Sequence, residues 1–421
     1  MALLLKPERL KRYAEIVALL VKYGRSDLVD RTALISPRSQ PREDAEPPTA
    51  EDLADDLEAL GPTFIKLGQL LSTRGDLLPE PYLDALSRLQ DQVEPFPYAE
   101  VEQIVSSEIG GRISKLFSEF ETKPVAAASL SQVHRATMRD GRAVVVKVQR
   151  PGVRRIIVED LEALEQVADF IDAHTETGRR YEFGNMLSDL RRSLLRELDF
   201  KREAENLHRL RRSLREFERI VIPRPVDDYT TSRVLTMDYI HGKKITDVSP
   251  LRMMELDTTR LAEEVFRAYL KQLLVDGFFH ADPHPGNVFI TEGDDLALLD
   301  LGMVSHISAS FREKLLRLLL ANSEGRGDDA VEAAMRMGEP KPNFDKTEYR
   351  QRVANLVTQN ADRTLNRLNA GQMVLKIAQI SADCWIRMPA EFTMISKAMM
   401  NLERVVYVLD PTFDPNAVIR A

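Results

Sequence analysis

Three side chains that could handle magnesium and phosphate lie close together in the stretch HADPHPGNVFITEGDDLALLDLGM. Asp282 and Asn287 are five residues apart, and Asp300 follows thirteen residues later. Amide and carboxylate oxygens are the ligands that Mg²⁺ prefers, and a carboxylate can also orient a nucleophile. Prolines at 283 and 285 stiffen the backbone around Asp282. The pattern therefore favours phosphoryl transfer, which needs charge neutralisation and positioning more than covalent help from the protein.

The spacing is that of the catalytic loop of protein kinases. There an Asp and an Asn stand five apart, and an Asp-Phe-Gly triplet follows a short pair of strands. Here the triplet is Asp-Leu-Gly at 300–302. Lys147, at the end of the apolar run 144–147, could contact nucleotide phosphates, and Glu197 or Glu203 could hold it. Spacing alone does not choose between the two glutamates, and a solvated lysine beside a salt-bridged helix face is the plain alternative.

The same stretch allows a second metal chemistry. His280 and His284 flank Asp282 and could bind a transition metal with it. No further His or Cys stands at ligand spacing, and such a site would leave Asn287 and Asp300 unexplained. Magnesium-dependent chemistry is therefore the preferred interpretation.

The bulk composition is that of a globular protein, with 421 residues, 43% hydrophobic and 29% charged. A net charge of −8 argues against nucleic-acid binding by bulk electrostatics. The single cysteine, Cys384, excludes an intrachain disulfide and fits a reducing compartment. No apolar run approaches the ~18 residues that cross a bilayer, and the run at 3–5 is too short for a signal peptide. The sequence therefore predicts a cytoplasmic protein.

The first 35 residues form a basic amphipathic segment. Apolar residues recur at helical spacing between 6 and 25, and lysines and arginines add positive charge. Such a helix either lies on an anionic membrane or docks on the body of the protein. Residues 36–49 follow as a proline-rich linker of mixed charge.

Two short helices are expected after the linker. Thr49 can cap the first, with Asp52 at the capping-box position, and Gly61-Pro62 ends it. The second begins at about Thr63. One face of this helix carries Phe64, Leu67 and Leu71. The opposite face carries Lys66, Gln69 and Thr73, and the hydrophobic pattern assigns it to solvent.

The middle of the chain changes to a strand pattern and then returns to helix. The expected elements are a loop of small residues at 126–131, strands at 132–138 and 142–148 joined by a turn at 140–141, helices at 153–175 and 183–218, strands at 220–222 and 233–237, a connection at 238–242, and strands near 288–300 within a mainly helical region from 254 onward.

Six ordered motifs resemble the UbiB family of atypical protein-kinase-like proteins, which is associated with coenzyme Q biosynthesis. They are FIKLGQLLSTR (64–74), AAASLSQVH (126–134), VVVKVQRPG (144–152), ELDFKREAEN (197–206), FFHADPHPGN (278–287) and LLDLG (298–302). The resemblance covers residues 50–305. It implies an α+β, protein-kinase-like two-lobed fold with a helical N-terminal extension over the active site and a mainly helical C-lobe. The implied segments are 50–120 for the extension, 121–240 for the N-lobe and 241–421 for the C-lobe.

The resemblance also implies roles for particular residues. Lys66 and Gln69, in the family's Lys-x-Gly-Gln motif, are expected to fold over the nucleotide site, with Lys66 paired to Glu197. Glu203 then becomes the partner of Lys147. The implied catalytic residues are Asp282 and Lys147, and the implied magnesium ligands are Asn287 and Asp300. The expected nucleotide-binding residues are Ala126, Ala127, Ala128, Ser129, Lys147, Glu203, Asp238, Ile240, Lys66, Gln69, Glu197 and Asp199.

By this resemblance, the protein binds Mg²⁺ with ATP or ADP, hydrolyses ATP, and contacts isoprenoid or anionic lipid and proteins of quinone biosynthesis. Alanines stand at 126–128, where ordinary kinases have glycines, and alanine largely forbids the positive φ with which glycine closes over phosphates. Together with the covered cleft, this argues against phosphorylation of protein substrates. Many family members have C-terminal membrane spans that are not expected here, so the basic helix becomes the expected contact with the inner membrane face.

Two other functions remain open. A small-molecule phosphotransferase of the aminoglycoside-kinase type uses a similar His-x-Asp-x-x-x-x-Asn loop, although the motif at 66–69 and the alanine loop argue against it. A non-enzymatic scaffold could use the nucleotide as a conformational switch. The presence of all the metal- and phosphate-binding residues argues against a scaffold that has lost its catalytic activity.

Overall fold

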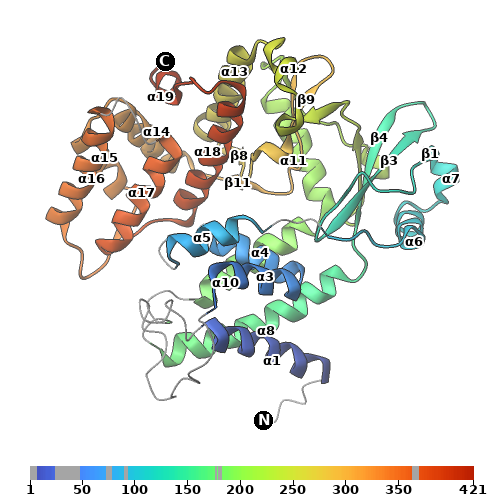
Figure 1. Cartoon of the computed structure of the whole chain (residues 1–421), viewed down its shortest axis with the longest axis horizontal. Helices are drawn as coiled ribbons and strands as arrows, with labels where there is room; N and C mark the ends of the chain where they lie inside the picture. Colours follow the sequence, from blue (N-terminus) through green and yellow to red (C-terminus); the bar gives the residue numbers. More distant parts are fainter. Residues whose placement is uncertain are drawn as a thin grey trace. The chain divides into compact units, whose positions relative to one another are not determined.

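The computed structural model describes residues 7–23, 48–72, 78–89, 93–175, 178, 183–362 and 369–421. Contacts group the chain into two compact units, whose elements are labelled in Figure 1. The first unit contains residues 1–200 and 228–236, and the second contains 201–227 and 237–421. The segment boundaries expected from the sequence remain predictions, and residues 36–47 of the expected linker lie outside the described residues.

The first unit combines a group of helices with a sheet. Its helices include α1 (Pro7–Tyr23), α3 (Ala50–Leu60), α4 (Pro62–Leu71), α5 (Glu80–Ser87), α6 (Tyr98–Ile109), α7 (Ile113–Leu116), α8 (Val153–His174) and α10 (Phe183–Glu197). The predicted start of α3 is confirmed, because Thr49 caps the helix and Asp52 completes a capping box. Gly61, at φ +97°, then separates α3 from α4.

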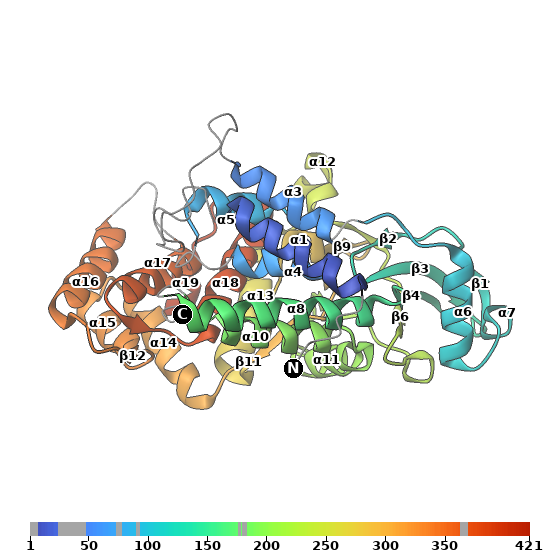
Figure 2. The ribbon, with the colours of Figure 1, turned by 90° about the horizontal axis from the view of Figure 1, so that it is seen from below.

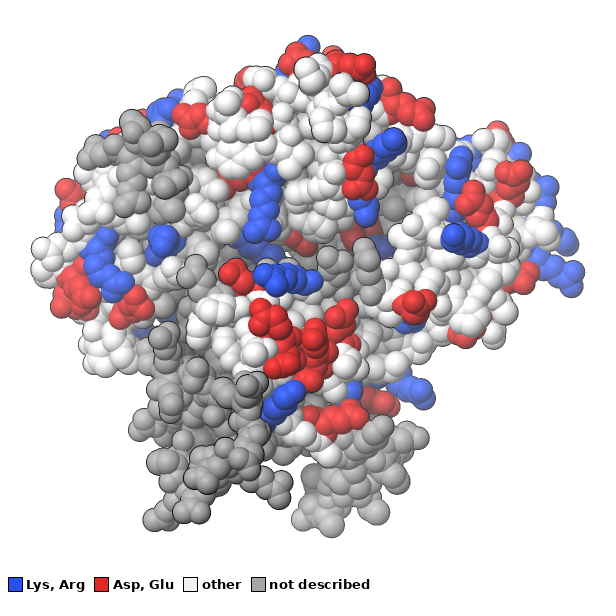
Figure 3. Space-filling model, in the orientation of Figure 1, with Lys and Arg blue, Asp and Glu red and all other residues white. Residues whose placement is uncertain are grey.

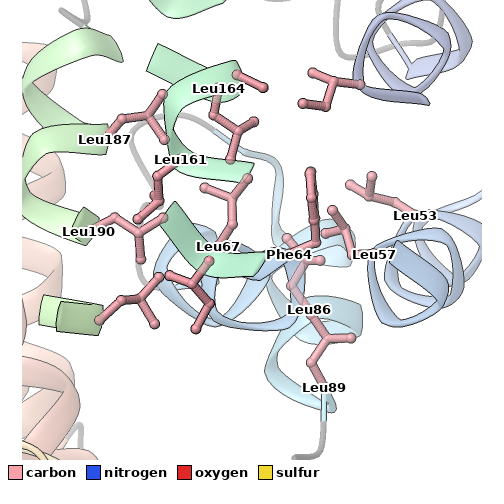
Figure 4. Packing of buried hydrophobic residues seen from close by; sticks show 14 of the residues in the cluster. Leu53, Leu57, Phe64, Leu67, Leu86, Leu89, Leu161, Leu164, Leu187 and Leu190 are labelled. Carbon is pink, nitrogen blue, oxygen red and sulfur yellow. The ribbon is translucent and has the colours of Figure 1, made fainter. Parts of the chain in front are cut away.

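Apolar side chains from α1, α3, α4, α5, α8 and α10 share one core, of which Figure 4 shows a part. Leu57 of α3, Phe64 of α4 and Leu86 of α5 are each at most 1% exposed. Leu161 of α8 and Leu190 of α10 belong to the same cluster. Helix α4, which carries the Lys-x-Gly-Gln motif, is therefore fixed by apolar packing against several neighbours.

The described part of α1 docks on the first unit itself. Arg12 donates to both carboxylate oxygens of Asp160 on α8, at 2.6 and 2.9 Å, and Lys22 pairs with Asp56 on α3 at 2.6 Å. Ile16 is only 1% exposed. Figure 2 shows α1 beside α8, with which it is in contact. These contacts favour the docked alternative for α1, while residues 1–6 and 24–35 of the expected basic segment lie outside the described residues.

The sheet of the first unit has the order β1-β3-β4-β6, with β2 paired to β3. Its strands are β1 (Phe117–Phe120), β2 (Ala126–Ala127), β3 (Ser131–Met138), β4 (Ala143–Gln149) and β6 (Val234–Asp238), of which β6 ends in the second unit. The predicted hairpin is confirmed, because β3 and β4 are antiparallel and Gly141 adopts φ +87° in the turn between them. The sequence pattern did not predict β1.

The loop of small residues is shorter than predicted. Ala126 and Ala127 pair with Val133 and Gln132, so these alanines belong to a strand. The turn itself spans 128–131 and is closed by a 2.7 Å hydrogen bond between its two ends. Extended backbone suits alanine, since it requires no positive φ.

The long helix expected at 183–218 is also wrong, because the chain forms two helices, α10 and α11 (Phe200–Ser213), with a break at 198–199. The side chain of Gln149 on β4 donates to the carbonyl of Leu198 (2.8 Å). The backbone N–H of Phe200 donates to the carbonyl of Ser232 (3.1 Å). These tertiary hydrogen bonds replace helical ones, so the break leaves fewer unpaired backbone groups.

The second unit is mainly helical. Its largest sheet has the order β5-β10-β9-β7, in which β5 and β10 are parallel and the other pairs are antiparallel. The predicted strands at 220–222 and near 288–300, and the predominance of helix after 254, are confirmed. After α11, the elements of this unit are β5 (Ile220–Val221), β7 (Gly242–Lys244), η2 (Ile245–Asp247), α12 (Pro250–Met254), α13 (Thr258–Leu270), η3 (Lys271–Asp276), β8 (Phe278–His280), η4 (Pro285–Asn287), β9 (Val288–Thr291), β10 (Leu296–Leu298), β11 (Val304–His306), α14 (Ala309–Ser323), α15 (Gly327–Met335), β12 (Glu339–Pro340), α16 (Lys346–Asp362), α17 (Ala370–Asp383), β13 (Ile386–Arg387), α18 (Ala390–Leu409) and α19 (Pro415–Arg420).

Two surface properties bear on contact with membranes. Helix α3 exposes Glu51, Asp52, Asp55 and Glu58, and Figure 3 shows acidic side chains gathered over this region. Within the described residues, the helices are all too short or too polar to span a bilayer.

Candidate active site

The loop that carries Asp282 lies in the second unit, between β8 and β9. At its start, the N–H of Ala281 donates to the carbonyl of Met303 (3.0 Å). At its end, the N–H of Leu299 donates to the carbonyl of Asn287 (2.9 Å). Both ends of the loop are thereby tied to the chain on either side of the Asp-Leu-Gly triplet, so the structure brings together the two parts of the predicted motif.

His280 holds the backbone at the start of this loop and is 1% exposed. Its N–H donates to Oε1 of Gln272 in the π-helix η3 (3.1 Å), and its carbonyl accepts from the hydroxyl of Tyr269 (2.9 Å). The ring Nδ1 lies 3.3 Å from the N of Asp282 and 3.3 Å from the carbonyl oxygen of Met303. Burial lowers the pKa of His280, although the nearby carboxylate of Asp282 opposes the shift. A neutral ring can then accept the N–H of Asp282.

The carboxylate of Asp282 receives a hydrogen bond from a helix far along the chain. Nδ2 of Asn401, on α18, donates to its Oδ1 at 2.7 Å. Asp282 is partly exposed, whereas Asn401 is 8% exposed. Sequence reasoning missed Asn401, for which the available signal was a polar residue among apolar neighbours at 398–402.

Asn287 and Asp300 have conformations that suit metal binding. Nδ2 of Asn287 faces the backbone carbonyl of Asp282 (3.4 Å), which directs the amide oxygen elsewhere. Asp300 is exposed and adopts φ +54°, a region in which Asp is among the tolerated residues. Its Oδ1 accepts the N–H of Gly302 (3.2 Å). Such uncommon backbone conformations concentrate at functional sites.

The donor set fits Mg²⁺ better than a transition metal. Asn287 and Asp300 offer hard oxygen donors, and Mg²⁺ is commonly held by one or two carboxylates together with substrate phosphates. Nδ1 of His284 accepts the N–H of Gly286 (2.9 Å), and His280 is engaged with the loop backbone. The described residues contain no group of three His, Cys, Asp or Glu side chains arranged to hold a metal. The alternative of a histidine metal site therefore finds no support.

Helix α11 supplies two residues to the second unit. Glu203, in its first turn, is 3% exposed. Nδ2 of Asn206 donates to the carbonyl of Leu301 (3.0 Å), which ties α11 to the Asp-Leu-Gly triplet and was not foreseen from the sequence. The pairing of Glu203 with Lys147 stays a prediction, because the two residues belong to different units.

Lys147 and the small-residue turn lie in the first unit. Lys147 is partly exposed on β4, opposite Val133 on β3. Its Nζ lies 5.3 Å from the ring centroid of Phe200, a distance at which the aromatic face attracts a cation. Ser129, in the turn at 128–131, is 1% exposed. The turn precedes β3, and the lysine stands on β4 opposite Val133, two residues beyond Ser131, the last residue of the turn.

Lys66 and Glu197 form the predicted ion pair. Nζ of Lys66 lies 2.9 Å from Oε1 of Glu197, and the two side chains are 10% and 20% exposed. The expectation from the hydrophobic pattern, that Lys66 lies on a solvated face, is wrong. The pattern of α4 alone could not show that α10 covers this face and supplies a carboxylate.

The rest of the Lys-x-Gly-Gln motif serves packing within the first unit. A Cβ at Gly68 would lie 2.3 Å from Cδ1 of Leu89 and 3.1 Å from Cδ1 of Leu57, so only glycine fits without a shift of these side chains. Nε2 of Gln69 donates to the carbonyl of Leu89 (3.2 Å). Thr73, at the end of the matching stretch, lies outside the described residues.

Three further residues of the expected nucleotide-binding set are partly exposed, namely Asp199, Asp238 and Ile240. Oδ2 of Asp238 accepts the N–H of Arg224 (3.0 Å), so this carboxylate has a structural role within the second unit. Their contacts with a nucleotide remain predictions.

A mostly apolar cavity of about 380 Å³ opens beside the small-residue turn in the first unit. Ser129, Ile65, Val93, Arg150 and Ile156 are among its lining residues. Of the expected nucleotide-binding residues that the structure describes, Ser129 is the one that lines it. Apart from Ser129, the residues expected to bind nucleotide and metal do not line this cavity.

The fold and the loop that carries Asp282 define a protein of the kinase-like class. Comparison with known families supports this class. Residues 88–333 match the ABC1 atypical kinase-like domain, and residues 353–414 match the UbiB helical domain. The chain belongs to this family of UbiB and ABC1 atypical kinase-like proteins.

Several curated proteins are similar to the chain. An uncharacterized Synechocystis protein is 37% identical over 88% of this chain and 63% of its own length. The Arabidopsis thaliana chloroplastic protein ACTIVITY OF BC1 COMPLEX KINASE 7 is 36% identical over 87% of this chain and 52% of its own length. The probable protein kinase UbiB of Marinobacter nauticus is 33% identical over 85% of this chain and 66% of its own length. The chain thus spans between half and two thirds of the length of these relatives.

One solved structure is similar in fold. It is the complex of Rv3197 with erythromycin from Mycobacterium tuberculosis, with a TM-score of 0.52 and 22% identity, covering 84% of this chain and 89% of that chain. At this identity the likeness concerns the fold alone.

Proposed function

We propose that this protein is an atypical kinase-like ATPase that binds Mg²⁺ with ATP or ADP and acts in the handling or biosynthesis of isoprenoid-quinone lipids at a membrane. The arrangement of the Asp282 loop carries the nucleotide part of the proposal. Asp282 has one carboxylate oxygen fixed by Asn401, Asn287 is oriented by the loop backbone, and Asp300 stands in an uncommon backbone conformation.

Each residue has a definite task in this proposal. Mg²⁺-ATP, when bound, supplies the phosphoryl group and much of the neutralising charge. Asn287 and Asp300 are the ligands for Mg²⁺. Lys147 neutralises phosphate charge, and Asp282 orients the attacking water and accepts its proton at Oδ2, since Oδ1 is bound by Asn401.

Hydrolysis is proposed in place of transfer to a protein. The alanines at 126–127 are held in a strand, so they do not supply the positive-φ backbone with which glycine-rich loops wrap phosphates. The Lys66–Glu197 pair keeps α4 in a fixed position on the first unit. The strand conformation of these alanines supports a chemistry that differs from that of ordinary protein kinases.

The lipid part of the proposal comes from the family resemblance. The described basic side chains of α1, Arg12 and Lys22, pair with carboxylates of the first unit, so they support docking more than membrane binding. The acidic face of α3 would be repelled by anionic lipid. A membrane contact, on the inner face of the membrane and in reach of quinone-biosynthesis proteins, would therefore use another surface of the protein.

Turnover of ATP by the full chain tests the proposal. We expect Mg²⁺-dependent release of phosphate that anionic vesicles stimulate, and a loss of at least about 100-fold in kcat for Asp300→Asn, since a metal ligand is removed. Asp294→Asn is the matched control, because it makes the same chemical change at another turn position of positive φ (+66°), where the carboxylate is partly exposed and pairs with Arg252. This control should turn over ATP at the wild-type rate.

The other outcomes identify the alternatives. Equal activity of Asp300→Asn and wild type would remove the catalytic assignment. Stoichiometric transfer of the γ-phosphate to a soluble metabolite would indicate a small-molecule phosphotransferase. Nucleotide binding without any turnover would indicate a scaffold that uses the nucleotide as a switch.

A further inference from the structure

Helix α18 contacts the Asp282 loop through the polar side chain of Asn401. Nδ2 of Asn401 donates to Oδ1 of Asp282 at 2.7 Å, across 119 residues of sequence. The helix also contacts η4, the turn that carries Asn287, and the neighbouring turn η2. All of these elements belong to the second unit.

The environment of Asn401 favours this contact. Asn401 is 8% exposed, and Ala398, Leu402 and Val405 around it on α18 are buried. Asparagine is an unfavourable residue in the middle of a helix, and a buried amide costs free energy unless it is hydrogen-bonded. A leucine would pack at this position without either penalty. The carboxylate of Asp282 supplies the acceptor, and a hydrogen bond to an ionised group is stronger than one between neutral groups.

The loop itself fixes its backbone more than its carboxylate. His280 and His284 direct their ring nitrogens to the N–H groups of Asp282 and Gly286, and the prolines at 283 and 285 restrict φ. None of these constraints sets the side-chain torsions of Asp282. Asn401 does so by binding one carboxylate oxygen, which leaves the other oxygen to meet the proton of a nucleophile.

We propose that Asn401 is a positioning residue that sets the rotamer of Asp282, so that the C-terminal helical region is part of the reaction machinery as well as of the fold. The inference rests on the proposed role of Asp282 in ATP turnover. The residues that match the UbiB helical domain, 353–414, would then influence the chemistry through α18.

Steady-state kinetics of full-length variants test this. Asn401→Leu keeps the number and branching of the side-chain heavy atoms and removes the donor, and we expect kcat to fall by about 10–100-fold while the KM for ATP changes by less than about 3-fold. Asn401→Asp, which places a second carboxylate beside Asp282, is expected to be at least as slow. Asn322→Leu is the matched control, since Asn322 is also 8% exposed and lies in the same unit, but on α14, outside the Asp282 loop and α18.

Dependence on Asp282 separates positioning from a general effect on folding. In an Asp282→Ala background, Asn401→Leu is expected to leave the residual turnover unchanged, because Asn401 acts through Asp282. A further loss of kcat in this background would assign Asn401 another role and overturn the proposal.

Hydrogen exchange gives a readout that does not require turnover. The peptide spanning 278–288 is expected to exchange faster in Asn401→Leu than in wild type or Asn322→Leu. If wild type hydrolyses ATP and Asn401→Leu keeps its kcat, the inference fails and the proposed function stands. If wild type does not hydrolyse ATP, the proposed function fails, and unchanged exchange in Asn401→Leu would then overturn the inference while faster exchange would support it.

Discussion

At the scale of single residues, the pair formed by Lys66 and Glu197 is the most informative contact of the first unit. Its side chains are 10% and 20% exposed, so water screens the two charges only in part. Removal of one partner leaves a mostly buried charge without its counterpart, which is more costly than the loss of an exposed pair.

A double-mutant cycle with Lys66→Met and Glu197→Gln measures this coupling. We expect a coupling free energy of about 1–3 kcal/mol from denaturant unfolding. The pair of Lys22 and Asp56, with exposures of 46% and 35%, is the control and is expected to give less than about 1 kcal/mol. Equal coupling in the two cycles would show that burial does not strengthen the Lys66 pair.

Residue roles could be predicted from the sequence only where a motif keeps its members close together. Asp282, Asn287 and Asp300 stand within one short stretch, and local hydrogen bonds hold them. Asn401 could not be predicted, because nothing within α18 shows which acceptor its amide will meet. The burial of Lys66 could not be predicted from periodicity for a similar reason, since α10, the helix that carries Glu197, lies more than a hundred residues further along the chain.

At the scale of elements, the junction of α17 and α18 contains an unusual carboxyl group. Glu403 is 0% exposed, and its Oε1 accepts the N–H of Gly371 at the start of α17 (3.2 Å). Burial raises the pKa of Glu403 to about 8 from the ordinary value of 4.5, although the backbone N–H groups of α17 oppose the shift.

This shift predicts a pH dependence of stability. Between about pH 4.5 and 8 the folded protein retains a proton that the unfolded chain has released, so the free energy of unfolding falls as pH rises through this range. The total effect of Glu403 is on the order of 3–5 kcal/mol. We expect Glu403→Gln to remove this part of the dependence and to exceed wild type in stability above pH 8, as measured by denaturant unfolding at several pH values. Glu339→Gln, at an exposed glutamate, should follow wild type, and parallel curves for all three proteins would contradict the assignment.

Elements whose ends depend on neighbouring residues were predicted well, whereas those that depend on distant contacts were not. The cap of α3 at Thr49 and the turn at Gly141 depend on neighbouring residues, and both are present as expected. The break between α10 and α11 depends on Gln149 and Ser232, which a helical pattern at 183–218 does not include.

At the scale of the whole molecule, family membership and the kinase-like fold agree with the expectation from six ordered motifs. The sequence pattern did not predict the division into compact units at residue 200, because this division depends on contacts between segments that are distant in the sequence. The basic character of the N-terminal segment suggested a membrane contact. Its pairing with Asp160 and Asp56 could not be predicted, because it depends on how the first unit folds.

Binding of nucleotide to the whole molecule is expected to stabilise it. At a free Mg²⁺-ATP concentration about 100-fold above Kd, the free energy of unfolding rises by about 2.7 kcal/mol. We expect thermal unfolding to show this increase with Mg²⁺ present, and chelation of Mg²⁺ or the Asp300→Asn substitution to reduce it. The same shift with and without Mg²⁺ would mean that Asn287 and Asp300 do not act through the metal.

Helix α1 has a consequence for how relatives of this protein can diverge. The Asp160 carboxylate is 4% exposed and accepts hydrogen bonds from Arg12 on α1 and from the hydroxyl of Thr63 on α4 (2.6 Å). A buried carboxylate that loses its cation is strongly destabilising. Positions 12, 63 and 160 are therefore expected to covary, so that a relative without the arginine also lacks the aspartate.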